Sequence, residues 1–230
     1  DGTEAGTIMV KNIAPSGGHS SPSNLVASNN LLFFTADNGV HGRELWKSDG
    51  TETGTVMVKD IKTGSTGSYP SYLTNVNGTV FFVIYTGVGY RELWKSDGTE
   101  TGTRRVKNFS EISFNKIENL VAVNNTLFFY IEKVGSTELW KSDGTETGTV
   151  MVKPIFMANP FVTPNGELFF TSSDGMHGGE LWKSDGTETG TMMVADVYSG
   201  APGSNATPVA YINGAVFFTA YSYSNGAELW

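Results

Sequence analysis

The feature that most constrains this chain is a long phrase that recurs almost unchanged. Glu-Leu-Trp-Lys-Ser-Asp-Gly-Thr-Glu-Thr-Gly-Thr occupies Glu44–Thr55, Glu92–Thr103, Glu138–Thr149 and Glu180–Thr191. A fifth copy is divided between the ends of the chain, with Glu228–Trp230 at the C-terminus and Asp1–Thr7 at the N-terminus. A repeat of this kind indicates a fold built from equal structural units.

The period of the repeat matches one blade of a β-propeller. Successive Trp residues are separated by 48, 46, 42 and 48 residues, and they are Trp46, Trp94, Trp140, Trp182 and Trp230. A four-stranded propeller blade takes roughly 40–50 residues. The spacing therefore predicts an all-β propeller of four-stranded antiparallel blades.

Each repeat predicts four strands, as residues 24–61 illustrate. Apolar runs at 24–28 and 31–35 flank Asn29-Asn30, a dipeptide favoured in tight hairpins. A third strand at 44–47 and a fourth at 56–61 flank the turn 48–54. Two adjacent Phe residues in the second strand point one ring to each face, which indicates a sheet packed between two others. These pairs are Phe33-Phe34, Phe81-Phe82, Phe128-Phe129, Phe169-Phe170 and Phe217-Phe218.

The divided fifth copy predicts how the ring closes. Residues 7–13 have the pattern of a fourth strand that no first, second or third strand precedes. We expect them to pair with the strand that contains Glu228–Trp230, giving one five-bladed propeller over residues 1–230, closed by a 3+1 blade that hides its sheet edges. The predicted repeats are 24–61, 71–109, 118–155, 159–197, and 207–230 plus 1–13.

Composition excludes several classes of protein. Lys and Arg number 15 against 23 Asp and Glu, a net charge of −8 that disfavours a nucleic-acid partner. The lack of cysteine excludes disulfide scaffolds, thiolate zinc sites and cysteine nucleophiles. No apolar run is long enough to predict a membrane span. Because the chain begins at Asp1 and not at Met, we expect an excised piece of a longer protein.

The repeated phrase resembles the ELWxxDGT repeat of large bacterial proteins that are secreted or displayed on the cell surface. That resemblance implies a propeller and an extracellular or cell-surface location, but no activity. The Ser-Asp-Gly-Thr stretch is also similar to the Asp-box turn, and the strand layout is similar to NHL and YWTD propellers. The chain departs from its own repeat at Ala5, at Arg104-Arg105, at Ala195, and in the fifth copy, which lacks Lys-Ser.

The invariant residues of the phrase favour a structural role over a site. The repeated Trp residues, together with Asp49, Asp97, Asp143, Asp185 and Asp1, are assigned to the framework of the repeat. The alternative is calcium binding by the turn carboxylates, although no metal or cofactor is assigned. Glu44 shares a strand face with Trp46, and we expect it to pair with an Arg or Lys of a neighbouring strand.

The loops that vary from repeat to repeat are the candidate binding surface. Central loops join the second and third strands of one repeat, and linking loops join the fourth strand to the next repeat; both fall on one face. These loops hold the candidate ligand-binding residues Tyr69, Tyr85, Tyr90, Tyr198, Tyr221, Tyr223, His41 and His177. Tyr suits stacking on sugars or a protein contact, while the alternative is that these side chains only pack their own loops.

The sequence therefore predicts a non-enzymatic binding module for a glycan or a protein, as a monomer or as one segment of a longer repeat protein. One alternative is a structural spacer without a dedicated ligand. A second alternative is a propeller hydrolase or lyase. The predicted first strands contain one carboxylate, Glu118, so they provide no acid–base pair, and no catalytic residue is assigned.

Overall fold

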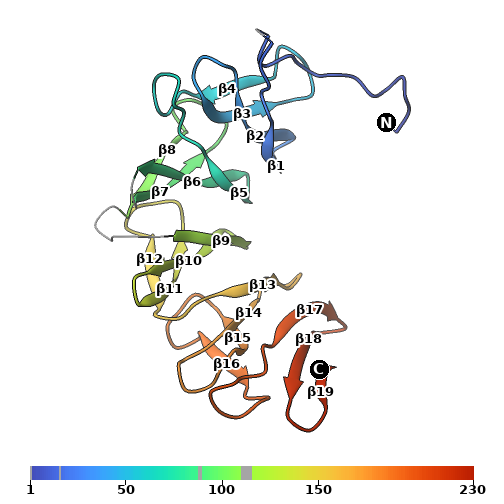
Figure 1. Ribbon diagram of the computed structural model, residues 1–230, viewed down its shortest axis with the longest axis vertical. Helices are drawn as coiled ribbons and strands as arrows, with labels where there is room; N and C mark the ends of the chain where they lie inside the picture. The colour runs from blue at the N-terminus through green and yellow to red at the C-terminus, as the bar shows by residue number, and fades with distance from the viewer. Residues whose placement is uncertain (1, 16, 88–89, 110–115) are drawn as a thin grey trace. The chain divides into compact units, whose positions relative to one another are not determined.

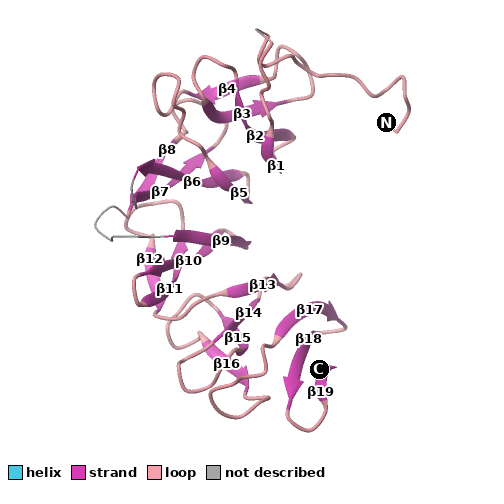
Figure 2. Cartoon of the chain, in the orientation of Figure 1, coloured by secondary structure: helices cyan, strands magenta, loops and turns pink. Residues whose placement is uncertain are grey.

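In the computed structural model, residues 2–15, 17–87, 90–109 and 116–230 are described, and these residues form strands, turns and loops (Figure 2). No helix in these ranges is long and apolar enough to cross a membrane. The chain divides into an N-terminal unit, Asp1–Ser110, and a C-terminal unit, Glu111–Trp230. All of the sheets are antiparallel, and strands follow one another in chain order within each sheet.

The N-terminal unit contains two four-stranded sheets (Figure 1). Sheet 1 consists of β1 (Ser23–Ser28), β2 (Leu31–Asp37), β3 (Arg43–Ser48) and β4 (Val56–Lys59). Sheet 2 consists of β5 (Ser71–Val76), β6 (Thr79–Gly87), β7 (Tyr90–Ser96) and β8 (Arg104–Asn108). The first strands of the two sheets, β1 and β5, lie beside each other.

The C-terminal unit contains three sheets (Figure 1). Sheet 3 consists of β9 (Lys116–Val123), β10 (Thr126–Lys133), β11 (Ser136–Ser142) and β12 (Val150–Lys153). Sheet 4 consists of β13 (Ala158–Val162), β14 (Leu168–Ser172), β15 (Glu180–Ser184) and β16 (Met192–Ala195). Sheet 5 has three strands, β17 (Thr207–Ile212), β18 (Ala215–Ser222) and β19 (Gly226–Leu229).

The adjacent Phe residues hold successive sheets together, as their pattern predicts. Phe33 and Leu45 of sheet 1 pack against Val80 and Phe82 of sheet 2. The second ring of the pair, Phe34, lies in a different cluster with Trp46 and Ile13. In the C-terminal unit, Phe128 of sheet 3 meets Phe170 and Trp182 of sheet 4, and Phe169 of sheet 4 meets Phe218 of sheet 5. The second strands of sheets 1 and 4, β2 and β14, are therefore packed on both faces.

The repeated turn satisfies its own polar groups. The Thr51 amide and hydroxyl both donate to Oδ1 of Asp49, at 2.9 and 2.7 Å. The Gly50 amide donates to the Ser48 hydroxyl, and the Thr55 hydroxyl donates to the Thr51 carbonyl. The same bonds recur around Asp97, Asp143 and Asp185. Hydrogen bonds from the Thr lower the pKa of Asp49, Asp97 and Asp185.

The segment expected as the fourth strand of the fifth repeat has no strand in the structure. Residues 7–12 carry no assigned strand, and β19 pairs with β18 alone. A strand exists through hydrogen bonds to a neighbour, and residues 7–12 lie outside all the sheets of the N-terminal unit. They nevertheless lie against sheet 1, because the Lys11 ammonium donates to the Glu52 and Thr55 carbonyls at 3.1 and 2.8 Å.

Lysines at the ends of two fourth strands bind the turn of the following sheet in the same way. Lys59 of β4 donates to the Glu100 and Thr103 carbonyls of the sheet 2 turn. Lys153 of β12 donates to the Glu188 and Thr191 carbonyls of the sheet 4 turn. Lys11 therefore has the contacts of a fourth-strand Lys although its own segment is not in a sheet.

The geometry of the turn excludes a side chain at Gly54. A Cβ added to this residue would lie 2.0 Å from Oδ1 of Asp49. We expect Gly54→Ala to lower the free energy of unfolding by about 1–3 kcal/mol, as an overpacked site does. The measurement is denaturant unfolding followed by Trp fluorescence. Adding Asp49→Ala removes the obstructing carboxylate, so the second substitution should cost less in the Gly54→Ala background than alone. Strictly additive effects would contradict this steric explanation.

Candidate functional site

The central and linking loops meet at one end of the sheets in both units. A Cβ on Gly42, in the central loop of sheet 1, would lie 2.5 Å from the Gly67 amide nitrogen in the following linking loop. A Cβ on Gly178, in the central loop of sheet 4, would lie 2.4 Å from the Gly203 amide nitrogen. Only glycine permits so close a backbone approach. The two kinds of variable loop therefore form one surface at each of these junctions.

Beneath the first junction lies Glu44, the Glu that opens the repeated phrase. Glu44 is 0% exposed, and its carboxylate accepts hydrogen bonds from the amides of Ile61 and Lys62, both at 3.3 Å, and from the Ser68 amide at 2.8 Å. The Ser68 hydroxyl donates to the same carboxylate. Burial raises the pKa of Glu44, and these hydrogen bonds oppose the rise. The carboxylate fixes the linking loop to sheet 1.

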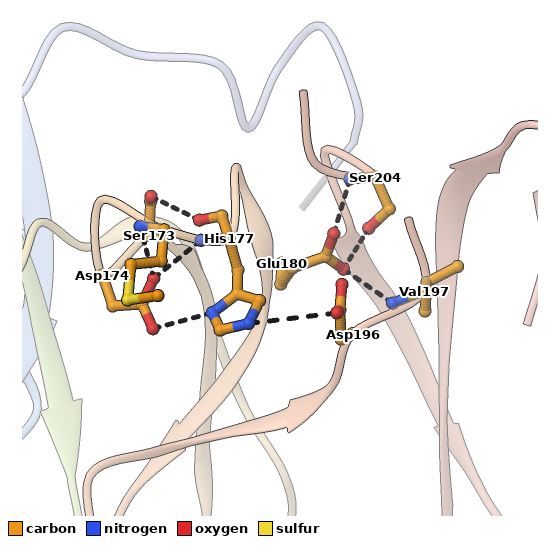
Figure 3. Close-up of polar contacts among 8 residues, drawn as sticks. Ser173, Asp174, His177, Glu180, Asp196, Val197 and Ser204 are labelled. Carbon is orange, nitrogen blue, oxygen red and sulfur yellow. Dashed lines mark hydrogen bonds and ion pairs between the residues drawn. The ribbon is translucent and has the colours of Figure 1, made fainter. Parts of the chain in front are cut away.

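Glu180 repeats this arrangement at the second junction (Figure 3). It is 0% exposed and accepts from the Val197 amide at 3.2 Å, the Ser204 amide at 2.7 Å and the Ser204 hydroxyl at 2.5 Å. Ser204 follows Gly203 just as Ser68 follows Gly67. A Gly-Ser step in the linking loop is therefore the sequence signal for this contact.

The corresponding Glu residues of sheets 2 and 3 are satisfied differently. Glu92 accepts from the Trp94 indole at 2.8 Å and from Arg105 at 2.8 Å. Glu138 accepts from the Trp140 indole at 2.9 Å and from Lys133 at 2.5 Å. A basic side chain from a neighbouring strand, the kind of partner expected for Glu44, thus binds the equivalent Glu in these two sheets.

The same prediction is wrong for sheets 1 and 4. There the linking loop supplies enough donors to satisfy Glu44 and Glu180 without a cation. With the carboxylate turned to the loop, the indole nitrogens of Trp46 and Trp182 are buried without a hydrogen-bond partner. This Glu therefore has two alternative sets of donors, one from the linking loop and one from an indole and a cation.

His177 lies in the central loop of sheet 4, between two carboxylates (Figure 3). Its Nδ1 is 2.9 Å from Asp174, and its Nε2 is 4.0 Å from Asp196. Hydrogen bonds from the His177 amide and ring lower the pKa of Asp174 to about 2, and the contact with Asp174 raises the pKa of His177. His41 occupies the equivalent place in sheet 1, but its ring contacts Asn38 instead of a carboxylate.

Three of the predicted Tyr residues form a cluster at the junction of sheets 4 and 5. The ring centroid of Tyr198 lies 5.7 Å from that of Tyr221 and 6.5 Å from that of Tyr223. Tyr223 is 87% exposed, so its ring faces solvent. A depression of about 410 Å³ beside these rings is lined by Val197, Tyr198, Ser199, Ser222, Tyr223 and Ser224. Aromatic faces and hydroxyl groups are therefore concentrated at one place.

The other candidates do not join a cluster of this kind. Tyr69 is exposed in the linking loop after sheet 1, and Tyr85 in β6 lies under the Arg91 guanidinium, 4.6 Å from its ring centroid. Within the described part of the N-terminal unit, Tyr69 and Tyr85 share no ring contact. The Tyr90 side chain and Asp1 lie outside the described residues. Across the described ranges, no group of three or more His, Asp and Glu side chains is arranged to hold a metal ion.

Sequence reasoning missed Ser199, Ser222 and Ser224 of the depression and the two linking-loop serines that bind Glu44 and Glu180. Ser199, Ser222 and Ser224 alternate with or follow the clustered Tyr residues, a spacing that places them on the same loops. Their polar character alone is common in loops, so it gave no signal of a site.

The chain matches no protein-family model and no curated protein sequence. Solved structures similar to it include prolyl oligopeptidase B from Galerina marginata (10% identity, TM-score 0.61, 92% of this chain and 35% of that one). An oligogalacturonate lyase in complex with manganese gives 13% identity, a TM-score of 0.57 and coverage of 93% and 62%. A puromycin hydrolase gives 14% identity, a TM-score of 0.54 and coverage of 90% and 35%. The chain thus spans less than two thirds of each of these proteins, and the likeness shows a β-propeller type of fold.

The carboxylates around His177 raise the pKa at which its ring loses its charge. Because the pKa of folded His177 is raised above its usual 6.5, the charged contact is complete below pH 6.5 and is lost as the pH rises through the folded pKa. We expect NMR titration of the imidazole to give a midpoint above 6.5, and Asp174→Asn to lower it. Asp185→Asn, in the turn of the same sheet, is the control and should leave the midpoint unchanged. Equal midpoints in all three proteins would show that Asp174 does not hold the charge.

Proposed function

We propose that this chain is a non-enzymatic binding module whose ligand-contacting surface is the cluster of Tyr198, Tyr221 and Tyr223. The single observation that carries the proposal is the meeting of these three rings beside a depression rich in hydroxyl groups. Binding residues on propellers and other rigid scaffolds lie in the loops that vary. The uniform turns at the opposite ends of the strands leave these loops free to differ.

A glycan is the ligand class that fits this surface best. Sugar rings present C–H faces that stack on tyrosine and hydroxyl groups that bond to side chains such as Ser199, Ser222 and Ser224. The nearby Asp196 and the net charge of −8 disfavour an acidic sugar. A neutral glycan is therefore proposed, with a protein loop as the second candidate, since exposed Tyr also serves as a protein contact.

The carboxylates argue for binding over catalysis. Glu44 and Glu180 accept several hydrogen bonds from loop amides and hydroxyls, and Glu92 and Glu138 are each occupied by an indole and a cation. These groups serve the framework of the sheets. The hydrolases and the lyase with a similar fold are enzymes, so an enzymatic function is the alternative proposal. Turnover of oligogalacturonate or of a peptide would establish it.

We also propose that residues 7–13 complete sheet 5, so that five four-stranded blades close into a ring through a 3+1 blade. In sheet 1 the third and fourth strands pair Trp46 with Met57 and Leu45 with Lys59. The equivalent register in the closing blade pairs Trp230 with Met9 and Leu229 with Lys11. The turn contacts of Lys11, which match those of Lys59 and Lys153, support this assignment.

The biological setting proposed here follows the resemblance to ELWxxDGT-repeat proteins, and it is extracellular or at the cell surface. The alternative of a spacer without a ligand rests on the near identity of the repeats. In a spacer, an exposed aromatic ring such as that of Tyr223 beside two other rings would have no function. The cluster therefore favours the binding module.

The binding proposal is tested on an array of neutral and acidic oligosaccharides. We expect binding to a neutral member that Tyr223→Ala and Tyr198→Ala each weaken by about tenfold or more, since stacked aromatic residues dominate such contacts. Tyr69→Ala removes an exposed Tyr outside the cluster and is the matched control. Equal loss in all three variants, or no binding to any sugar or surface protein, would contradict the assignment.

Closure is tested by amide hydrogen exchange on the intact chain. We expect the amides of residues 8–11 to exchange as slowly as those of β4, residues 56–59, because both segments would then donate to a third strand. Exchange at the rate of an unstructured peptide would show that sheet 5 keeps only three strands.

A further inference from the structure

One ring of the cluster formed by Tyr198, Tyr221 and Tyr223 has a counterpart in sheet 2. Tyr221 of β18 and Tyr85 of β6 hold the same position, the third residue after the two adjacent Phe residues. In sheet 2 the Arg91 guanidinium lies over the Tyr85 ring, 4.6 Å from its centroid. At this distance a cation is attracted to the negative face of the ring. The chain therefore shows a cation on a tyrosine at this position of the repeat.

The cation of sheet 2 has no equivalent in sheet 5. Arg91 directly precedes the Glu of the repeated phrase and pairs across the strands with Tyr85. The residue at the same place in sheet 5 is Ala227, which pairs with Tyr221. In the described part of the C-terminal unit, no Lys or Arg side chain lies over a ring of the cluster. Sheet 5 thus keeps the tyrosine and lacks the cation.

The rings of the cluster are close enough to contact one cation together. The Tyr198 centroid is 5.7 Å from that of Tyr221 and 6.5 Å from that of Tyr223, and the planes of Tyr198 and Tyr223 are inclined by 59°. A cation interacts with a ring when it lies within about 6 Å of the centroid. An ammonium group beside Tyr198 can therefore contact a second ring at the same time.

Negative charge dominates the sheets that carry the cluster. Residues 154–230 contain seven Asp and Glu but a single Lys or Arg, which is Lys183. Lys183 belongs to β15 and lies beside Asp185 of the repeated turn. Asp196, in contrast, directly precedes Val197, which lines the depression beside the cluster (Figure 3). This excess of carboxylates attracts a cationic ligand and repels an acidic one.

The lining of the depression favours a sugar as the carrier of the cation. Ser199, Ser222 and Ser224 line it beside the rings. Ser222 is buried, and its hydroxyl has no hydrogen-bond partner among the described residues. A buried hydroxyl without a partner is unfavourable, and a hydroxyl group of a ligand can supply the missing bond. A lysine side chain offers an ammonium group but no hydroxyl.

We propose that the Tyr cluster binds the ammonium group of an amino sugar, which takes the place that the Arg91 guanidinium has in sheet 2. The inference rests on the proposed function, because it uses the same rings and the same depression, and it ranks a cationic sugar above a neutral one. A neutral sugar still stacks on the tyrosine faces, but it lacks the attraction between a cation and the rings. It therefore binds more weakly.

Two oligosaccharides that differ only at nitrogen test the charge. One is an oligomer of glucosamine, whose amines are charged below their pKa, and the other is an oligomer of N-acetylglucosamine of the same length, which is neutral. Calorimetry with the full chain, at a pH below the amine pKa, should give about tenfold tighter binding of the charged oligomer. Tyr223→Ala should weaken the binding of both, because both stack on the rings.

A substitution in sheet 5 tests the position of the ammonium group. Ala227→Arg places a guanidinium opposite Tyr221, as Arg91 lies opposite Tyr85. This cation should remove the preference for glucosamine, because it occupies the ring and repels a second positive charge. Ala227→Gln adds a polar side chain without charge, and as the matched control it should keep the preference. Binding of the N-acetylglucosamine oligomer reports that each variant is folded.

Four results would contradict parts of the proposal. A preference that persists in Ala227→Arg as in Ala227→Gln would overturn the cation site. Equal affinity of the unmodified chain for both oligomers, weakened by Tyr223→Ala, would overturn this inference alone and leave the proposed function in place. If neither oligomer binds, the amino sugar is wrong, and the proposed function fails as well where no other glycan of the array binds. A lysine-containing peptide that matches the affinity of the glucosamine oligomer would overturn the sugar as the carrier.

Discussion

A carboxylate that is removed from water must be given donors, and this requirement shapes sheets 1 to 4. The Glu that precedes Leu-Trp lies near the start of the third strand, where a bare charge would be costly. In sheets 1 and 4 a linking loop folds over it and donates amides and a serine hydroxyl. In sheets 2 and 3 an indole and a basic side chain take that role.

Much of the framework could be predicted from residue patterns because it depends on local rules. The doubled Phe, the Asn-containing hairpins and the Asp-Gly-Thr turn each act over a few residues, and all of them take the expected form. The partners of Glu44 and Glu180 could not be predicted, because they come from a loop whose position depends on two glycines approaching across a junction. The Tyr cluster likewise joins Tyr198, in the linking loop after sheet 4, to Tyr221 of β18 and Tyr223 of the central loop of sheet 5.

The division between uniform and variable ends of the strands has a physical basis. Each Asp-Gly-Thr turn forms its hydrogen bonds within itself, and a Cβ on its last Gly would collide with the Asp carboxylate, so substitutions there disturb the turn directly. The central and linking loops have fewer such constraints. His41 and His177 occupy the same place, yet one contacts Asn38 and the other lies between Asp174 and Asp196. Similar backbones thus carry different chemistry at equivalent positions.

The lysine at the end of the fourth strand in sheets 1 and 3 bears on how such a protein changes its size. Lys59 and Lys153 bind main-chain carbonyls of the following repeat, so the contact depends on the backbone of the turn and not on which side chains it carries. A repeat that follows a strand with this lysine can therefore differ in its side chains with the joint intact, whereas β16 carries Ala195 in place of the lysine. Gain or loss of a whole repeat next to such a lysine preserves the joint, because the main chain of the turn supplies the acceptors.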